Sequence, residues 1–129
     1  MKIVVTSVFV DDQAKALAFY RDVLGFELKH DIPMGQFRWL TLTSPEGVAG
    51  VELVLEPVAF DPARGYQKAL YDAGIPATAF ISTDIAAEVQ RLKARSVRFR
   101  GEPTNAGPVI VVLFEDTCGN LINLVQPVA

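Results

Sequence analysis

The sequence predicts a single α+β domain built from two copies of a β-α-β-β-β unit. Short stretches rich in β-branched residues, typical of strands, are interspersed with segments of helical spacing. The order strand, Asp cap, helix, strand and strand pair recurs after about 72 residues, so that Val8 and Asp12 fall on Phe80 and Asp84. Two repeats are too few for a solenoid, and they favour two curved sheets side by side. The length of 129 residues fits one domain.

The first unit is expected to cover about residues 1–57. Residues 3–10 predict a strand, and Asp11 or Asp12 then offers an N-cap for a helix. Gly25 supplies the stop for this helix, because a left-handed backbone is inexpensive only without a Cβ. The strands that follow are predicted at residues 26–30, 37–43 and 51–55, with a turn at residues 44–47.

A connector of about residues 58–75 is expected next, followed by the second unit over about residues 76–129. The connector is weakly helical over residues 61–73, with Pro62 in the first turn and Gly74 as terminator. The second unit predicts a strand at residues 76–82 and a helix from Asp84 to Arg95. Further strands are expected to begin at Arg98 and to cover residues 109–114 and 120–126.

Composition excludes several classes of function. Half of the residues are hydrophobic, 21% are charged, and the formal net charge is −3. Acids and bases are interspersed, and no basic stripe is apparent that would release counterions from a nucleic acid, so we expect no nucleic-acid partner. No segment predicts a membrane span or a cationic amphipathic helix, so we expect no membrane partner and a cytoplasmic location. The single cysteine, Cys118, cannot form an internal disulfide.

Three stretches carry a resemblance to a known family. They are residues 6–12 with 16–26, which read TSVFVDD, ALAFY and VLGF, then residues 50–53, GVEL, and residues 114–121, FEDTCGNL. Together they resemble the vicinal oxygen chelate superfamily, which contains glyoxalases, bleomycin-resistance proteins and dioxygenases. The resemblance implies a cup-like eight-stranded mixed sheet with helices on its outer face, and a homodimer.

The resemblance also implies where a divalent metal would bind in the metal-dependent members. The corresponding positions here are Val5, Glu52, Thr78 and Asn123. Only Glu52 is a good ligand, whereas a catalytic zinc needs about three protein ligands. We therefore predict no metal and no other cofactor. The alternative is a divalent metal held by Glu52, Glu56 and residues of a partner subunit.

Glu52 is the candidate catalytic residue, and it also heads the predicted ligand-binding set. It lies mid-strand, so Glu52, Val54 and Glu56 share the concave face if Val51, Leu53 and Leu55 pack under the helices. A carboxylate there can anchor a ligand or act as a base, or it can simply be solvated. The full predicted set is Phe9, Phe37, Trp39, Glu52, Glu56, Thr78, Phe80 and Asn123. The aromatic members would line an apolar pocket, and ordinary core packing is the alternative for each of them.

Two reactive side chains are expected to have no chemical role. His30 is the only histidine and lies near a strand end, where a structural or exposed position is more common than a catalytic one. Cys118 has no local base or positive charge that would lower its pKa, so it is interpreted as a turn residue.

Three functions remain open at this point. The leading hypothesis is a small-molecule binding protein similar to the bleomycin-resistance proteins, without a metal and with Glu52 as polar anchor. The second is an enzyme of glyoxalase, isomerase or dioxygenase type, in which Glu52 abstracts a proton or binds a divalent ion. The third is a structural or interaction module that has lost the site.

Overall fold

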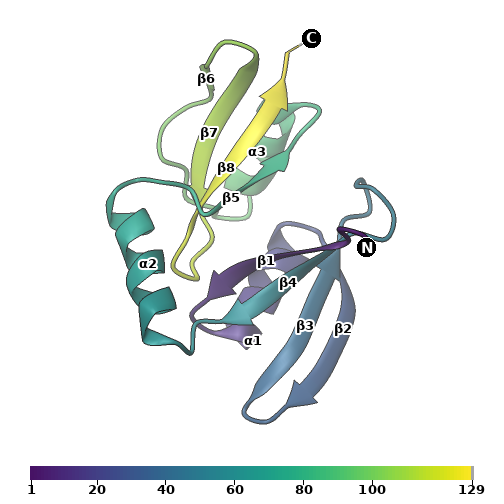
Figure 1. Cartoon of the computed structure of the whole chain (residues 1–129). Coiled ribbons are helices and arrows are strands. Elements are labelled where there is room, and N and C mark those ends of the chain that lie inside the picture. The colour runs from purple at the N-terminus through teal and green to yellow at the C-terminus, as the bar shows by residue number, and fades with distance from the viewer. Residues whose placement is uncertain (129) are drawn as a thin grey trace. The chain divides into compact units, whose positions relative to one another are not determined.

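The computed structural model describes residues 1–128 and has the α+β architecture that the sequence predicts. The chain divides into two compact units, Met1–Gly65 and Tyr66–Ala129, of which Ala129 lies outside the described residues. The division falls within helix α2 (Asp61–Asp72), inside the expected connector. Each unit holds a four-stranded mixed sheet (Figure 1).

The first unit follows the β-α-β-β-β order. Its elements are β1 (Val5–Val10), α1 (Gln13–Leu17), η1 (Ala18–Val23), β2 (Glu27–Met34), β3 (Phe37–Thr43) and β4 (Glu52–Pro57). The strand order in the sheet is β1-β4-β3-β2. β1 pairs in parallel with β4, and the other neighbours pair antiparallel. β1 and β2 are therefore the two edges of this sheet.

The helix of the first unit begins and ends where the sequence predicts. The Asp12 side chain caps it by accepting a hydrogen bond from the backbone N–H of Lys15 at 3.0 Å. The helix widens to π geometry in η1, where the Leu24 N–H donates to the Phe19 carbonyl. Gly25 then ends it with a φ of +92°, a conformation that suits glycine.

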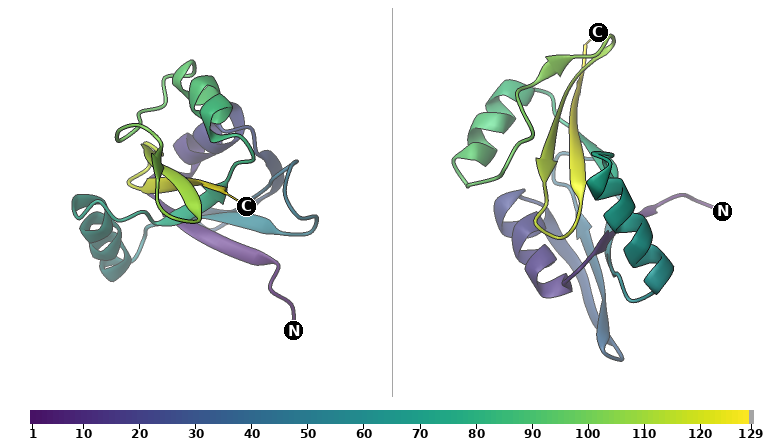
Figure 2. Two further views of the ribbon diagram at one scale, coloured as in Figure 1. Left: turned by 90° about the horizontal axis from the view of Figure 1, so that it is seen from above. Right: turned by 90° about the vertical axis from the view of Figure 1, so that its left-hand side faces the viewer.

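The core of the first unit lies between this helix and one face of the sheet (Figure 2). Alternate strand residues, Val8, Val10, Leu40, Leu42 and Leu55, are buried. From the helix, Ala16 and Tyr20 are also buried. The opposite face of the sheet has no helix of this unit over it, and its side chains range from buried, as at Thr41 and Val54, to partly exposed, as at Trp39.

The second unit repeats the arrangement with shorter strands. Its elements are β5 (Thr78–Ile81), α3 (Ile85–Lys93), β6 (Thr104–Asn105), β7 (Val109–Glu115) and β8 (Leu121–Pro127), in the strand order β5-β8-β7-β6. Asp84 caps α3 as expected, and its side chain accepts from the Ala87 N–H. The prediction of a strand beginning at Arg98 is wrong. Phe99 makes only an isolated bridge to Phe114, and β6 begins later, at Thr104.

A buried polar turn joins β7 to β8. Asp116 is fully buried, and its Oδ1 accepts from the backbone N–H groups of Cys118 at 2.8 Å and Asn120 at 3.0 Å. Its Oδ2 accepts from Asn120 Nδ2 at 2.7 Å. Gln67 of α2 then donates to Asn120 Oδ1 and to the Cys118 carbonyl, both at 3.2 Å. The turn is therefore fixed to α2 by side-chain hydrogen bonds.

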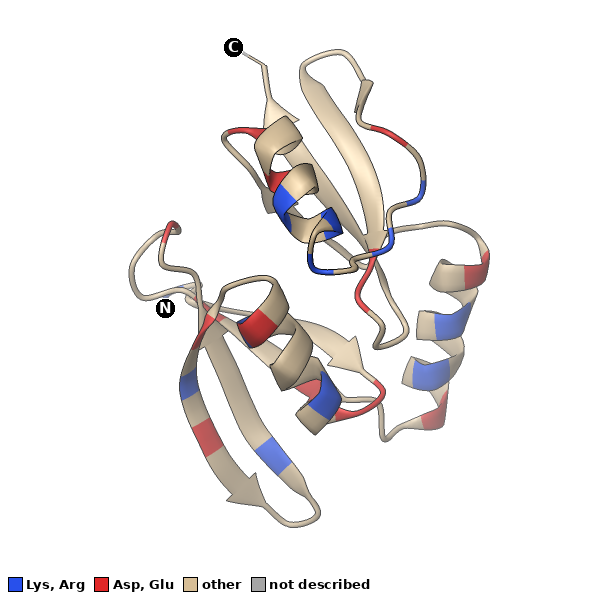
Figure 3. Cartoon of the chain, turned by 180° about the vertical axis from the view of Figure 1, so that it is seen from behind, with Lys and Arg blue, Asp and Glu red and all other residues tan. Residues whose placement is uncertain are grey.

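Basic side chains gather on α3 and the loop after it in the second unit (Figure 3). They are Arg91, Lys93, Arg95, Arg98 and Arg100. Acidic partners accompany three of them: Glu88 pairs with Arg91, Glu102 with Lys93, and Glu115 with Arg100. No helix of residues 1–128 is long and apolar enough to cross a membrane.

Glu115 makes the stability of the second unit depend on acidic pH. Its carboxylate accepts a hydrogen bond from the Tyr71 hydroxyl, and this bond, helped by Arg100, lowers its pKa below the ordinary value. A carboxylate with a depressed folded-state pKa stabilises the protein above its unfolded pKa, and this stability is lost as pH falls through the folded pKa. We expect Glu115→Gln to lose less unfolding free energy than the wild type between pH 7 and about pH 3.

Urea denaturation at the two pH values measures this difference. Glu102→Gln is the matched control, because the Glu102 side chain is 78% exposed and, among the described residues, its only ion pair is with the exposed Lys93 ammonium at 3.4 Å. Equal pH dependence of Glu115→Gln and the wild type would contradict the assignment.

Candidate functional site

The candidate site lies on the open face of the β1-β4-β3-β2 sheet. Strand alternation and the pairing register place the side chains of Glu52, Val54 and Glu56 on this face of β4. Phe9 of β1 is level with Glu56, and Trp39 lies on the same side of β3. Thus the structure brings together five of the predicted ligand-binding residues in one unit. They are Phe9, Phe37, Trp39, Glu52 and Glu56.

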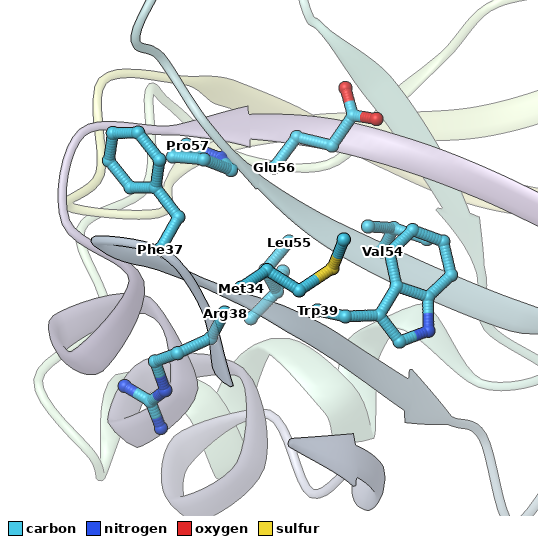
Figure 4. Close-up of a pocket in the computed structure, with 8 residues that line it drawn as sticks. All are labelled: Met34, Phe37, Arg38, Trp39, Val54, Leu55, Glu56 and Pro57. Atoms are coloured by element: carbon cyan, nitrogen blue, oxygen red, sulfur yellow. The ribbon is translucent and has the colours of Figure 1, made fainter. Parts of the chain in front are cut away.

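A pocket of about 390 Å³ opens on this sheet where β3 and β4 separate. The two strands pair only at Thr41 with Val54 and at Leu42 with Leu53, although both strands continue further. The pocket is lined by Met34, Phe37, Arg38, Trp39, Val54, Leu55, Glu56 and Pro57 (Figure 4). Its walls are mostly apolar, with a few polar groups, which is the composition of small-molecule sites.

Gln13 fills the gap between the two strands from the helix side. Its Nε2 donates to the carbonyl oxygens of Arg38 at 2.7 Å and Leu55 at 2.9 Å, and its Oε1 accepts from the Arg38 N–H at 3.0 Å. The side chain is buried. One amide therefore replaces the missing strand pairing, because buried backbone groups need partners. It holds β3 and β4 apart at the pocket.

The basic and the acidic side chains around the pocket point to different sides of the first sheet. The Arg38 guanidinium makes a two-point pair with Asp31, at 2.8 and 2.9 Å, and the hydrogen bond from Arg38 lowers the pKa of Asp31. Figure 4 shows this guanidinium pointing away from the Glu56 carboxylate. The basic group is thus already engaged, and the carboxylates of Glu56 and Glu52 remain on the open face.

Glu52 is held in place rather than freely solvated. Its Oε1 accepts a hydrogen bond from the Thr41 hydroxyl at 2.8 Å, and His30 Nε2 lies 3.7 Å from the same oxygen. The Glu52 side chain is 20% exposed, whereas Thr41 is fully buried. Glu52 does not itself line the pocket but lies on the same sheet face, two residues before Val54, which does. A carboxylate fixed in this way can accept a hydrogen bond from a ligand.

The second unit does not place its predicted residues on one face. Thr78 pairs with Ile122 and Phe80 pairs with Leu124, so both share the face of β8 residues that are buried toward α3. Asn123 points to the other face. The expectation that Thr78, Phe80 and Asn123 face one concave surface is therefore wrong. Phe80 corresponds by the repeat to Val8, which is also buried on the helix side.

The implied metal positions do not fit a divalent ion. Val5 has no donor atom and Glu52 supplies one carboxylate, while Thr78 and Asn123 lie on opposite faces of their sheet. Within residues 1–128 no group of three or more His, Cys, Asp or Glu side chains is placed to hold a metal ion. Cys118, the single cysteine of the sequence, is a buried thiol in the β7–β8 turn.

Among the residues of this site that sequence reasoning missed are Gln13, Thr41 and Met34. Gln13 follows the N-cap residue Asp12. Its hydrogen bonds reach two strands far away in the sequence, and no pattern of neighbouring residues indicates such contacts. Thr41 lies two residues after Trp39 on the predicted strand and therefore shares its face, which could have placed it on the side of Glu52. Met34 lies beyond the predicted end of β2, at residue 30, and was therefore not considered.

The comparisons with known proteins agree with this architecture. The model of the glyoxalase/bleomycin resistance protein/dioxygenase superfamily matches residues 2–124. The chain belongs to this superfamily. The protein YurT of Bacillus subtilis (strain 168), itself uncharacterized, is 54% identical over 126 residues, which cover 98% of this chain and 99% of YurT.

Other similar proteins are less identical to this chain, and the names of two of them state what those proteins do. Mitochondrial methylmalonyl-CoA epimerase of Mus musculus is 30% identical over 125 residues, which cover 93% of this chain and 70% of the epimerase. Among solved structures, UcmS2 has a TM-score of 0.81 at 28% identity, and covers 97% of both chains. TnmS3, an antibiotic binding protein from Streptomyces sp. CB03234, has a TM-score of 0.76 at 30% identity, over 99% of this chain and 97% of its own.

Proposed function

We propose that this protein binds a small, partly apolar molecule on the open face of its first sheet, with Glu52 as polar anchor and without the usual metal of its superfamily. The observation that carries the proposal is a fixed, partly covered carboxylate on the same sheet face as an apolar pocket of about 390 Å³. The pocket supplies apolar area to a ligand, and the carboxylate supplies orientation. Phe9 and Glu56 would complete this face.

The similarity to TnmS3 supports a binding role. That protein is described as antibiotic binding, and it is similar to this chain over nearly its whole length. Flat aromatic molecules that carry a hydrogen-bond donor are the chemistry that Trp39 and Glu52 would suit. Such a ligand would be neutral or cationic where it meets Glu52.

Trp39 offers a direct measurement of binding, because it is the only tryptophan, it lines the pocket and it is 36% exposed. We expect flat aromatic compounds to change its fluorescence and to raise the melting temperature of the protein. Trp39→Ala should weaken binding of any hit about tenfold or more, because it removes a large apolar contact. Glu52→Gln should weaken binding of hits that carry an N–H or O–H donor.

Phe60→Ala is the matched control for Trp39→Ala. Phe60 is an aromatic residue of the first unit that is exposed and does not line the pocket. Thermal shifts measure binding to Trp39→Ala, because this variant has no tryptophan fluorescence. A screen in which no compound shifts the melting temperature would count against the proposal, as would hits that bind Trp39→Ala and the wild type equally.

A second candidate is an enzyme in which Glu52 abstracts a proton next to a carbonyl or binds a divalent ion. The similarity to the mouse epimerase favours it. Metal analysis of the purified protein, with nickel, zinc, manganese and iron added back, tests this function. Stoichiometric metal that is lost in Glu52→Gln would support it and would overturn the metal-independent proposal. A structural or interaction module would bind neither metal nor small molecule.

The assembly and location of the protein are further parts of the proposal. The superfamily resemblance favours a homodimer, and light scattering during size exclusion would then give twice the chain mass of 14.1 kDa. A cytoplasmic location is proposed from the composition and is tested by fractionation of the source cells.

A further inference from the structure

An irregularity in β2 turns His30 toward the ligand face. In a regular strand residues two apart share a face, so Leu28 and His30 would point the same way. Instead Leu28 pairs with Leu42, which is buried on the helix side, whereas His30 pairs with Thr41, whose hydroxyl reaches Glu52. The pairing register shifts between Leu28 and His30, as in a β-bulge with one extra residue. Bulges commonly re-aim a side chain next to a functional site.

The contacts of Glu52 leave it one oxygen for a ligand. Oε1 is occupied by the Thr41 hydroxyl at 2.8 Å. Among residues 1–128, Oε2 of Glu52 has no hydrogen-bond partner. Because an ionised carboxylate only accepts hydrogen bonds, a ligand group that meets Oε2 must present an N–H or O–H donor to bond with it.

His30 supplies the complementary donor. Its Nε2, which carries the proton in one of the two neutral imidazole tautomers, lies 3.7 Å from Glu52 Oε1, beyond hydrogen-bond distance. The His30 side chain is 42% exposed, so an incoming group can reach the Nε2–H. An imidazole N–H beside a carboxylate oxygen presents one donor and one acceptor to a single ligand group.

We infer that His30 and Glu52 together recognise a ligand in which an N–H or O–H donor lies beside a carbonyl acceptor, as in a primary carboxamide on a flat aromatic ring. This inference rests on the proposed function, and it deepens it by naming the polar group of the ligand. The ligand N–H donates to Glu52 Oε2, the ligand carbonyl accepts from His30 Nε2–H, and the ring occupies the pocket beside Trp39. His30 is thereby a specificity-determining residue, and Thr41 is a positioning residue for Glu52.

The probes 1-naphthamide and N,N-dimethyl-1-naphthamide test this assignment, because they share a ring and a carbonyl and differ in the N–H donors. Trp39 fluorescence and calorimetry measure their affinities. The wild type should bind the primary amide at least about tenfold more tightly, since a site built around a polar group discriminates against the analogue that leaves it unpaired. His30→Ala should weaken the primary amide about tenfold. His30→Gln keeps an N–H donor and should restore part of the loss.

Lys29→Ala is the matched control, because Lys29 is the exposed extra residue of the same irregularity. Its affinity for both probes should equal that of the wild type. The unfolding midpoints of His30→Ala and Lys29→Ala should match the wild type, so that a binding change is not a folding change.

The outcomes separate this inference from the proposed function. If both amides bind equally well, or if His30→Ala discriminates as the wild type does, while Trp39→Ala weakens binding about tenfold or more, the inference is overturned and the proposed function stands. If neither naphthamide nor any aromatic compound of the wider screen affects Trp39 fluorescence or the melting temperature, the proposed function fails and this inference fails with it.

Discussion

Asp116→Ala is expected to lower the free energy of unfolding by about 2 to 4 kcal/mol. The substitution removes a fully buried carboxylate that accepts from the Cys118 N–H, the Asn120 N–H and the Asn120 side-chain amide. These donors would stay buried without an acceptor, and each such loss is costly. The Asn120 amide also receives the hydrogen bond from Gln67, so the link between the turn and α2 would weaken as well.

Urea denaturation followed by circular dichroism measures this effect. Thr117→Gly in the same turn is the matched control, because Thr117 is exposed and has a φ of +63°, which glycine adopts without strain. That variant should retain wild-type stability or gain a little. A loss below about 1 kcal/mol in Asp116→Ala would show that water or a rearranged turn replaces the carboxylate.

Local signals predicted the elements of this fold well. Asp12 and Asp84 act as helix caps, and Gly25 ends the first helix, because these positions depend on hydrogen bonds and dihedral angles within a few residues. The strand at residues 37–43 has the predicted bounds. The strand predicted to begin at Arg98 was wrong, because a short apolar stretch forms a strand only where a partner strand pairs with it. Phe99 makes a single bridge, to Phe114.

The candidate site was predicted only where the strands are regular. Alternation placed Glu52, Glu56 and Trp39 on one face, because β3 and β4 keep a period of two. The prediction for Thr78 was wrong because it came from the implied metal positions, in which Thr78 corresponds to Val5. The repeat offset of about 72 residues instead aligns Thr78 with Thr6, and a shift of one residue moves a side chain to the opposite face of a strand. Phe80 was misplaced although the repeat aligned it with the buried Val8.

Contacts that depend on irregular strands could not be predicted from the sequence. His30 reaches Glu52 through a register shift, and no pattern of residues in β2 marks where the extra residue lies. Pro33 also lies within β2, where it argues against a long strand, yet β2 is an edge strand and tolerates it. The predicted strand therefore ended too early, at residue 30, and excluded Met34.

Gln13→Ala is expected to affect both folding and the pocket, and it should cost about 2 to 4 kcal/mol of unfolding free energy. It removes three hydrogen bonds to the backbone of Arg38 and Leu55 at the point where β3 and β4 have no pairing of their own. The strands can then close or slide, and the pocket between them loses its fixed width. Gln90→Ala, at an exposed position of α3, is the matched control and should leave stability and binding unchanged.

The effect of Gln13 on binding can be separated from its effect on folding. Affinity for 1-naphthamide is measured in native buffer, where circular dichroism shows the variant to be folded. We expect at least about fivefold weaker binding, because part of the binding energy must then order the pocket. Unchanged affinity in the folded variant would show that Gln13 only stabilises the first unit. A pocket that depends on a side-chain amide between separated strands would instead explain how the open face of a small sheet offers a preformed site.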